Sequence, residues 1–207
     1  MAQQDAPFEA ISDTLRRAAA ALRDAEIPFL LGGSLASWAR GGPPLARDLD
    51  FMLKEEDADR ALHALEEAGM RTERPPEEWL VKAYDGDVLI DLIFAPEGME
   101  MTDEVIARGE ELPVMAVRVR VMALEDVLAT KLRALDEHAL DYTSLLQISR
   151  SLREKIDWDA VRAETGDSPY AKAFFTLVEE LGIAPRATGA AERRIRVTPS
   201  LPTAQAS

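Results

Sequence analysis

Residues 27–39 read IPFLLGGSLASWA. The apolar run at 27–31 predicts a strand, Gly32 and Gly33 predict a turn, and residues 34–39 predict the start of a helix. Glycines let the backbone approach a phosphate closely, and the free N–H groups at the positive end of the following helix attract it. Ser34 either caps that helix or donates its hydroxyl to a phosphate oxygen. This strand, turn and helix unit therefore predicts an α/β protein with a phosphate-sized loop.

Three aspartates follow the glycine turn. Thirteen residues separate Ser34 from the pair Asp48 and Asp50, and Asp91 lies inside the apolar run VLIDLIF at 88–94. Residues i and i+2 of a strand share a face, so Asp48 and Asp50 point together. An ionised carboxylate within an apolar strand costs free energy unless a positive charge offsets it, and a divalent cation is the simplest offset. If the two strands are neighbours, the three carboxylates converge on a site that selects Mg²⁺ or Mn²⁺.

These motifs resemble the signature of the DNA polymerase β-like nucleotidyltransferase superfamily. The signature places a hydrophobic residue before Gly-Gly-Ser, then Asp-hydrophobic-Asp, and later an acid between hydrophobic residues. The corresponding stretches here are 31–34, 48–51 and 90–92, with a gap at the upper end of the family range. The nearer resemblance is to small bacterial nucleotidyltransferases, which include antibiotic-modifying enzymes and AbiEii-type toxin–antitoxin proteins, and it covers about residues 25–155.

The resemblance implies an α/β (α+β) fold with a mixed β-sheet core flanked by helices and followed by a C-terminal helical bundle. It also implies transfer of a nucleoside monophosphate, AMP first of all, from an NTP to a hydroxyl acceptor with release of pyrophosphate. Asp48 and Asp50 would hold two Mg²⁺ or Mn²⁺ ions, and Asp91 would complete one shell and help deprotonate the acceptor. Many relatives carry a threonine ahead of the first acid, where this chain reads PLAR at 44–47. Arg47, or else Arg40, is the expected substitute for that triphosphate contact.

A second group of candidates lies in the expected helical half. Lys131 falls in the middle of the apolar stripe of the helix expected at 123–135, a position that solvated lysines avoid. Asp141 falls on the stripe of the next expected helix, at 139–154. One interpretation is a structural ion pair between Lys131 and Asp141. The other places Lys131 over the triphosphate as a point charge that Asp141 orients, and related nucleotidyltransferases carry a lysine and a later acid in such helices.

Composition restricts the class of protein. The chain has 207 residues, no cysteine and a formal net charge of -14. Disulfides and thiolate metal sites are therefore excluded. The negative charge argues against broad nucleic-acid binding, although a basic pocket for one nucleotide is compatible with it. We find no signal-like segment and no apolar run of membrane-spanning length, so we expect a cytoplasmic protein without membrane association. The sequence does not fix an oligomeric state.

The order of predicted elements divides the chain into a nucleotidyltransferase core at 1–121, a helical subdomain at 122–183 and a disordered tail at 184–207. The acidic runs at 54–57 and 108–111 are expected to be solvated faces, and Trp79 either stacks on a ligand or packs in the core. Strands are predicted at 27–31, 48–53, 79–84, 87–94 and 115–122. Helices are predicted at 8–25, 34–39, 55–68, 123–135, 139–154, 157–165 and 168–181.

The acceptor is left open by these residues. A hydroxylated small molecule such as an antibiotic is one candidate, and tRNA or a partner protein modified by a toxin-like enzyme is another. A third hypothesis is a catalytically lapsed nucleotide-binding module. The intact acids at 48, 50 and 91 argue against the third, and the net charge argues mildly against tRNA.

Overall fold

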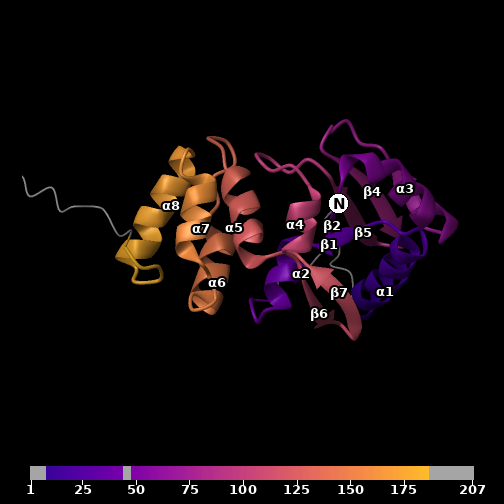
Figure 1. Ribbon diagram of the computed structural model, residues 1–207, viewed down its shortest axis with the longest axis horizontal. Helices are drawn as coiled ribbons and strands as arrows, with labels where there is room; N and C mark the ends of the chain where they lie inside the picture. Colours follow the sequence, from indigo (N-terminus) through magenta and orange to yellow (C-terminus); the bar gives the residue numbers. More distant parts are fainter. Residues whose placement is uncertain (1–7, 44–47, 187–207) are drawn as a thin grey trace, which may run out of the picture.

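The computed structural model describes residues 8–43 and 48–186, which form an α/β protein with two adjoining parts (Figure 1). One part is a mixed sheet with its helices, and the other is a group of four helices, so the predicted fold class is confirmed. The strands are β1 (Phe29–Leu31), β2 (Leu49–Leu53), β3 (Arg71–Glu73), β4 (Leu80–Asp85), β5 (Val88–Ile93), β6 (Glu110–Val114) and β7 (Val117–Val121). The helices are α1 (Phe8–Asp24), α2 (Gly33–Trp38), α3 (Ala58–Glu67), α4 (Asp103–Ala107), α5 (Leu124–Arg133), α6 (Thr143–Leu152), α7 (Trp158–Thr165) and α8 (Pro169–Glu180), with a 3₁₀ turn at Glu55–Asp57.

The strands form one sheet in the order β3-β4-β5-β2-β1-β7-β6. β2 runs parallel to β5 and β1 runs parallel to β7, whereas all other neighbours are antiparallel. The register of the central pair sets Asp50 directly beside Asp91. The sheet therefore brings together two acids that are separated by about forty residues of chain.

Different helices cover the two faces of the sheet. Leu49, Phe51 and Leu53 of β2 point to one face and are fully buried. Helix α1 lies on that face, where the Thr14 hydroxyl donates a 2.9 Å hydrogen bond to Asp85 of β4, and α3 packs beside α1. Helix α2 packs against β2 and α5 on the other face, which carries the Asp50 carboxylate. The acids thus lie on the face that the long N-terminal helix leaves uncovered.

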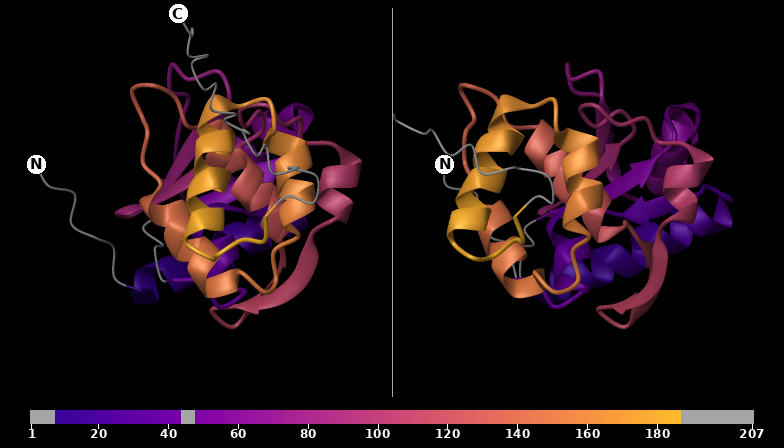
Figure 2. Two further views of the ribbon diagram at one scale, coloured as in Figure 1. Left: turned by 90° about the vertical axis from the view of Figure 1, so that its left-hand side faces the viewer. Right: turned by 60° about the vertical axis from the view of Figure 1, so that its left-hand side comes forward.

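Two apolar clusters hold the molecule together. The larger one fills the space between the sheet and its helices, and the smaller one lies within α5 to α8, which the turned views show as one group (Figure 2). Helix α5 contributes to both, because Val127 belongs to the first cluster and Leu128 and Leu132 belong to the second. This shared helix joins the sheet to the helical part. The predicted domain boundary at 121/122 falls just before α5 and stays a prediction.

The sequence analysis missed three short elements, namely β3, α4 and β6. Both strands are sheet edges with mostly exposed side chains, which removes the alternation that marks a half-buried strand. The acids at 110 and 111 are exposed as expected, but Asp57 is 5% exposed and pairs with Arg60 at 2.7 Å. The predicted helix at 139–154 begins only at residue 143.

The C-terminal prediction is tested only at its beginning. Ala184 is buried, and its backbone N–H donates to the Val178 carbonyl at 3.2 Å, so the ordered part reaches at least this residue. The remainder of the expected tail, residues 187–207, lies outside the described residues. Among the described helices, none combines the length and the apolar character that a membrane span requires.

Candidate active site

The three predicted acids meet at one place on the sheet. Asp48 precedes β2, Asp50 lies on β2, and Asp91 lies at the middle of β5. Each contributes a carboxylate oxygen to a set of atoms that all lie within 4.8 Å of one another. The i and i+2 positions on β2 and the parallel pairing with β5 produce this cluster. A donor set of carboxylate oxygens alone suits a hard divalent cation.

The cluster is electrostatically costly in the absence of a cation. Burial, followed by repulsion from Asp48 and Asp91, raises the pKa of Asp50 to about 7, although Lys131 and Lys82 act in the opposite direction. Burial also raises the pKa of Asp91, while the hydrogen bond from Lys82 lowers it. The site therefore favours the uptake of a positive charge, as either a proton or a metal ion.

Lys82 is a site residue that the sequence analysis missed. Its Nζ atom lies 3.0 Å from Asp91 Oδ1, and the two residues face each other in the antiparallel pairing of β4 and β5. Burial opposes the charged form of Lys82, but the hydrogen bond with Asp91 raises its pKa overall. Lys82 therefore offsets part of the charge of Asp91, and the expected divalent cation at this acid stays a prediction. The hairpin turn Asp85-Gly86 carried the signal, since it places residue 82 opposite residue 91.

The glycine turn lies against the acids. Gly33 has φ 57°, and a Cβ atom on it would overlap the Asp50 carboxylate, so only glycine fits here. The backbone N–H of Gly32 donates to the Asp50 carbonyl at 2.8 Å. Ser34 does not cap α2, which begins at Gly33, and its buried Oγ has no hydrogen-bond partner among the described residues. The expected cap is therefore not formed, and the expected phosphate contact of Ser34 stays a prediction.

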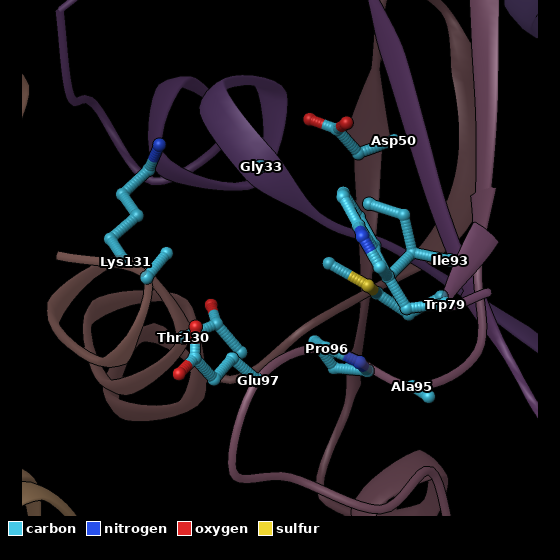
Figure 3. A pocket seen from close by; sticks show the side chains of 11 residues that line it. Gly33, Asp50, Trp79, Ile93, Ala95, Pro96, Glu97, Thr130 and Lys131 are labelled. Carbon is cyan, nitrogen blue, oxygen red and sulfur yellow. The ribbon is translucent and has the colours of Figure 1, made fainter. Parts of the chain in front are cut away.

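Lys131 lies across a pocket from the acids. The pocket has a volume of about 600 Å³, and its lining includes Gly33, Asp50, Trp79, Glu97 and Lys131. The Lys131 ammonium extends along the edge of the pocket toward α2 (Figure 3). This lysine makes no ion pair or side-chain hydrogen bond with any described residue, and it lowers the pKa of Asp50 through space. Its charge is therefore available to a ligand.

The predicted partnership between Lys131 and Asp141 is wrong. Asp141 is exposed and precedes α6, and its Oδ1 atom accepts the backbone N–H of Thr143 at 2.8 Å. Hydrogen bonding with the Thr143 side chain, and then with its backbone N–H, lowers the pKa of Asp141. Because α6 begins at residue 143, Asp141 does not lie on the apolar stripe of the helix. Neither the structural ion pair nor the orientation of Lys131 by this acid is formed.

The structure describes only one of the two arginines that were expected to contact the triphosphate. Arg47 lies outside the described residues. Arg40 donates to the carbonyls of Ala36 and Val121 at 3.1 and 3.4 Å and lines a different hollow, together with Arg108 and Lys155. Arg40 is thus occupied away from the acids, and within the described chain Lys131 supplies the unpaired cation of the pocket.

Comparison with known families assigns this chain. The model of the family described as "Nucleotidyl transferase of unknown function (DUF2204)" matches residues 11–171. The chain belongs to this nucleotidyl transferase family. The match spans the glycine turn, the three acids and Lys131. A search of the curated proteins found no match.

Solved structures agree on the fold of this nucleotidyl transferase. The solution structure of the antibiotic-resistance factor ANT(2'')-Ia superposes with a TM-score of 0.59 at 16% identity, covering 85% of this chain and 98% of that one. The crystal structure of ANT(2'')-Ia with adenylyl-2''-tobramycin gives a TM-score of 0.58 at 17% identity, covering 79% and 98%. A Thermotoga maritima protein described as a nucleotidyltransferase gives 0.50 at 14% identity, covering 64% and 89%. At these identities the likeness concerns the fold alone.

Proposed function

We propose that this nucleotidyl transferase moves a nucleoside monophosphate, AMP first of all, from an NTP to the hydroxyl group of a small molecule. The acid cluster carries the proposal, because three carboxylates converge beside a pocket, where burial and repulsion from Asp48 and Asp91 raise the pKa of Asp50 to about 7. Such a cluster is a poor structural element and a good cation site. The free ammonium of Lys131 on the opposite wall adds a contact for an anionic ligand.

The cluster fits the divalent ions that the family resemblance implies. Asp48, Asp50 and Asp91 would hold Mg²⁺ or Mn²⁺, two ions in the proposal, and Gly33 leaves the space that the Asp50 carboxylate needs. Such ions, when bound, stabilise charge on the entering and leaving oxygens.

In the proposed reaction, the protein's own residues bind the triphosphate and take up the proton of the acceptor. Lys131 binds the triphosphate, and Lys82 holds the Asp91 carboxylate in place. Asp91 takes the proton from the acceptor hydroxyl. The acceptor oxygen forms a bond to the α-phosphorus, the bond to the β-phosphate oxygen breaks, and pyrophosphate leaves. Catalysis by position and charge of this kind needs no covalent enzyme intermediate.

A hydroxylated small molecule is the acceptor that we favour. A structure of similar fold contains an adenylylated aminoglycoside, adenylyl-2''-tobramycin, in ANT(2'')-Ia. The net charge of -14 opposes the alternative tRNA acceptor. Modification of a partner protein remains the alternative outcome of the experiment below.

The test is a transfer assay with each α-labelled NTP, Mg²⁺ or Mn²⁺, and three acceptor pools: hydroxylated antibiotics, tRNA and cell lysate. We expect pyrophosphate release and labelling of a small molecule, both abolished by EDTA and by Asp50→Asn. Asp87→Asn, the same change at an exposed position outside the cluster, should retain activity. Labelling of tRNA or protein would show that the acceptor is a macromolecule rather than a small molecule. Transfer that persists in EDTA would show that the reaction does not need a divalent metal ion.

A further inference from the structure

The pocket beside the acids has two chemically different ends. Figure 3 shows the Asp50 carboxylate and the Lys131 ammonium toward one end, and Glu97 and Thr130 toward the other. Trp79, Ile93 and Pro96 supply apolar surface between them. A pocket of about 600 Å³ has the size and the mixed lining of a small-molecule site. A ligand with an anionic chain and a flat, partly polar ring would match both ends.

The end formed by Glu97 and Thr130 offers hydrogen-bond acceptors. The Glu97 carboxylate is exposed and makes no ion pair or hydrogen bond with any other described residue. The carbonyls of Asp126 and Val127, 3.0 and 3.1 Å from Thr130 Oγ1, share the single hydroxyl hydrogen of Thr130, so its lone pairs are what remain for a ligand. A group bound here must therefore donate hydrogen bonds.

The wall that carries Glu97 is fixed rather than loose. The Trp79 carbonyl accepts the backbone N–H groups of Phe94 and Ala95 at 3.1 and 3.2 Å, which ties the start of β4 to the segment after β5. Farther along, Met99 donates to the Pro96 carbonyl at 3.0 Å and closes a turn around Glu97. Gly98 has φ 69° and lies against the Arg133 side chain of α5, which would have to move to admit a Cβ atom. Glu97 thus lies on the same pocket as α5, the helix that carries Thr130 and Lys131.

Trp79 gives the pocket an aromatic surface. Its side chain is 44% exposed, which is unusual for a tryptophan placed for core packing, and it lines the pocket. Aromatic side chains stack on any nucleobase with little regard to its identity. Stacking on Trp79 therefore supplies affinity, whereas the hydrogen-bond acceptors Glu97 and Thr130 discriminate among bases.

We propose, as an extension of the proposed function, that this end of the pocket binds the nucleobase of the NTP and that Glu97 selects bases carrying an exocyclic amino group. Adenine, guanine and cytosine each present an amino group to a carboxylate. Uracil presents two carbonyl oxygens around one N–H, and the carboxylate repels those oxygens. A site built to accept a donor discriminates against an analogue that lacks it, because the carboxylate loses its hydrogen bond to the base. Glu97 is accordingly a specificity-determining residue.

Calorimetry with Mg²⁺ and matched nucleotide pairs tests this assignment. Purine riboside 5′-triphosphate differs from ATP only by the missing 6-amino group, and UTP presents a carbonyl where CTP presents an amino group. We expect the wild-type protein to bind ATP and CTP about tenfold more tightly than their counterparts. Glu97→Ala should bring both ratios close to unity, and Glu97→Gln, whose amide also donates, should favour UTP relative to wild type.

Two further variants separate selection from simple affinity. Trp79→Ala should weaken all four nucleotides alike and leave both ratios unchanged. Glu100→Ala removes the same charge from an exposed position three residues away and should change neither affinity nor ratio. Thermal melting of each variant checks that the fold is retained.

The possible failures are distinguishable. Mg²⁺-dependent NTP binding with ratios near unity in the wild type, or ratios unaltered by Glu97→Ala, would overturn the nucleobase assignment and leave the proposed function standing. If Glu97→Ala kept the wild-type affinity ratios but transferred less nucleotide to the acceptor, this end of the pocket would be assigned to acceptor binding. A protein that binds none of the four nucleotides would overturn both proposals.

Discussion

The two walls of the pocket carry charges of opposite sign. On the strand wall, Asp91 is paired with Lys82 at 3.0 Å, while Asp50 lies close to the other acids and forms no ion pair with a described residue. On the helix wall, Lys131 stands without any partner among the described residues. The strand wall therefore carries excess negative charge, and the helix wall carries an ammonium group that no described residue neutralises. The difference indicates which groups are satisfied in the protein alone and which await a ligand, and substitutions can test it residue by residue.

Asp50→Asn should have the largest effect. The substitution removes a charge from the acid whose pKa is raised most, so we expect activity to fall by roughly a thousandfold while the metal-free protein melts at the same temperature or higher. Asp91→Asn should also abolish activity but should not stabilise, because it leaves Lys82 without its partner. Activity assays and thermal melts of both variants with EDTA measure the contrast. Equal melting shifts would remove the distinction between the two acids.

Lys131→Met should have the next largest effect, on nucleotide binding. Methionine keeps the length and the apolar stem of lysine, and Asp141 is exposed and bonded to Thr143, so no buried partner is stranded. We expect Mg²⁺–ATP to bind about ten- to a hundredfold more weakly, with the melting temperature unchanged. Calorimetry and a thermal melt measure the two quantities. A destabilised variant with normal nucleotide affinity would assign a structural role to Lys131.

The pH dependence of metal binding follows from Asp50. Because its pKa in the metal-free protein is about 7, the carboxyl group must lose a proton before it binds a cation. Below pH 7, the apparent Mg²⁺ affinity should therefore fall by up to about tenfold per pH unit. The raised pKa also means that the folded state binds more protons than the unfolded state, so the stability of the metal-free protein should decrease as pH rises from about 4 to about 7. Calorimetry and melts across this range test both trends, and a flat profile would contradict them.

Lys82→Met should have the smallest effect of these substitutions. Loss of the ammonium leaves the buried Asp91 carboxylate unpaired, so we expect the metal-free protein to lose about 1–3 kcal/mol. The same change makes the cluster more anionic, so added Mg²⁺ should stabilise the variant more than it stabilises the wild type. Melts with EDTA and with Mg²⁺ give the two differences. If Mg²⁺ stabilised both proteins equally, Lys82 would not compete with a cation at Asp91.

The convergence of the acids was accessible to sequence reasoning. The i and i+2 spacing of Asp48 and Asp50 fixes their common face, and the apolar flanks of Asp91 fix a buried strand. The glycine turn was readable too, because few residues other than glycine adopt the backbone of Gly33 and none larger fits beside Asp50. Local rules of this kind operate within one or two elements, where sequence distance and spatial distance agree.

The features that were missed depend on longer-range pairing. Lys82 becomes a partner of Asp91 only through the register of β4 and β5, which the hairpin turn implied but apolar patterning did not show. Asp141 was misplaced because the helix start at Thr143, rather than the apolar period, decides whether that residue is on the stripe. Glu97 carries no periodic signal at all, since it lies in a turn whose position against α5 depends on Gly98 and Arg133.

The central claim is that the acid cluster binds a divalent cation together with the triphosphate. Calorimetric titration of ATP into the protein, once with Mg²⁺ and once with EDTA, tests it most directly. The charge excess at Asp48, Asp50 and Asp91 predicts saturable binding with Mg²⁺ and none measurable with EDTA, because the carboxylates repel the phosphates unless a cation lies between them. Equal affinity in the two titrations would contradict the account.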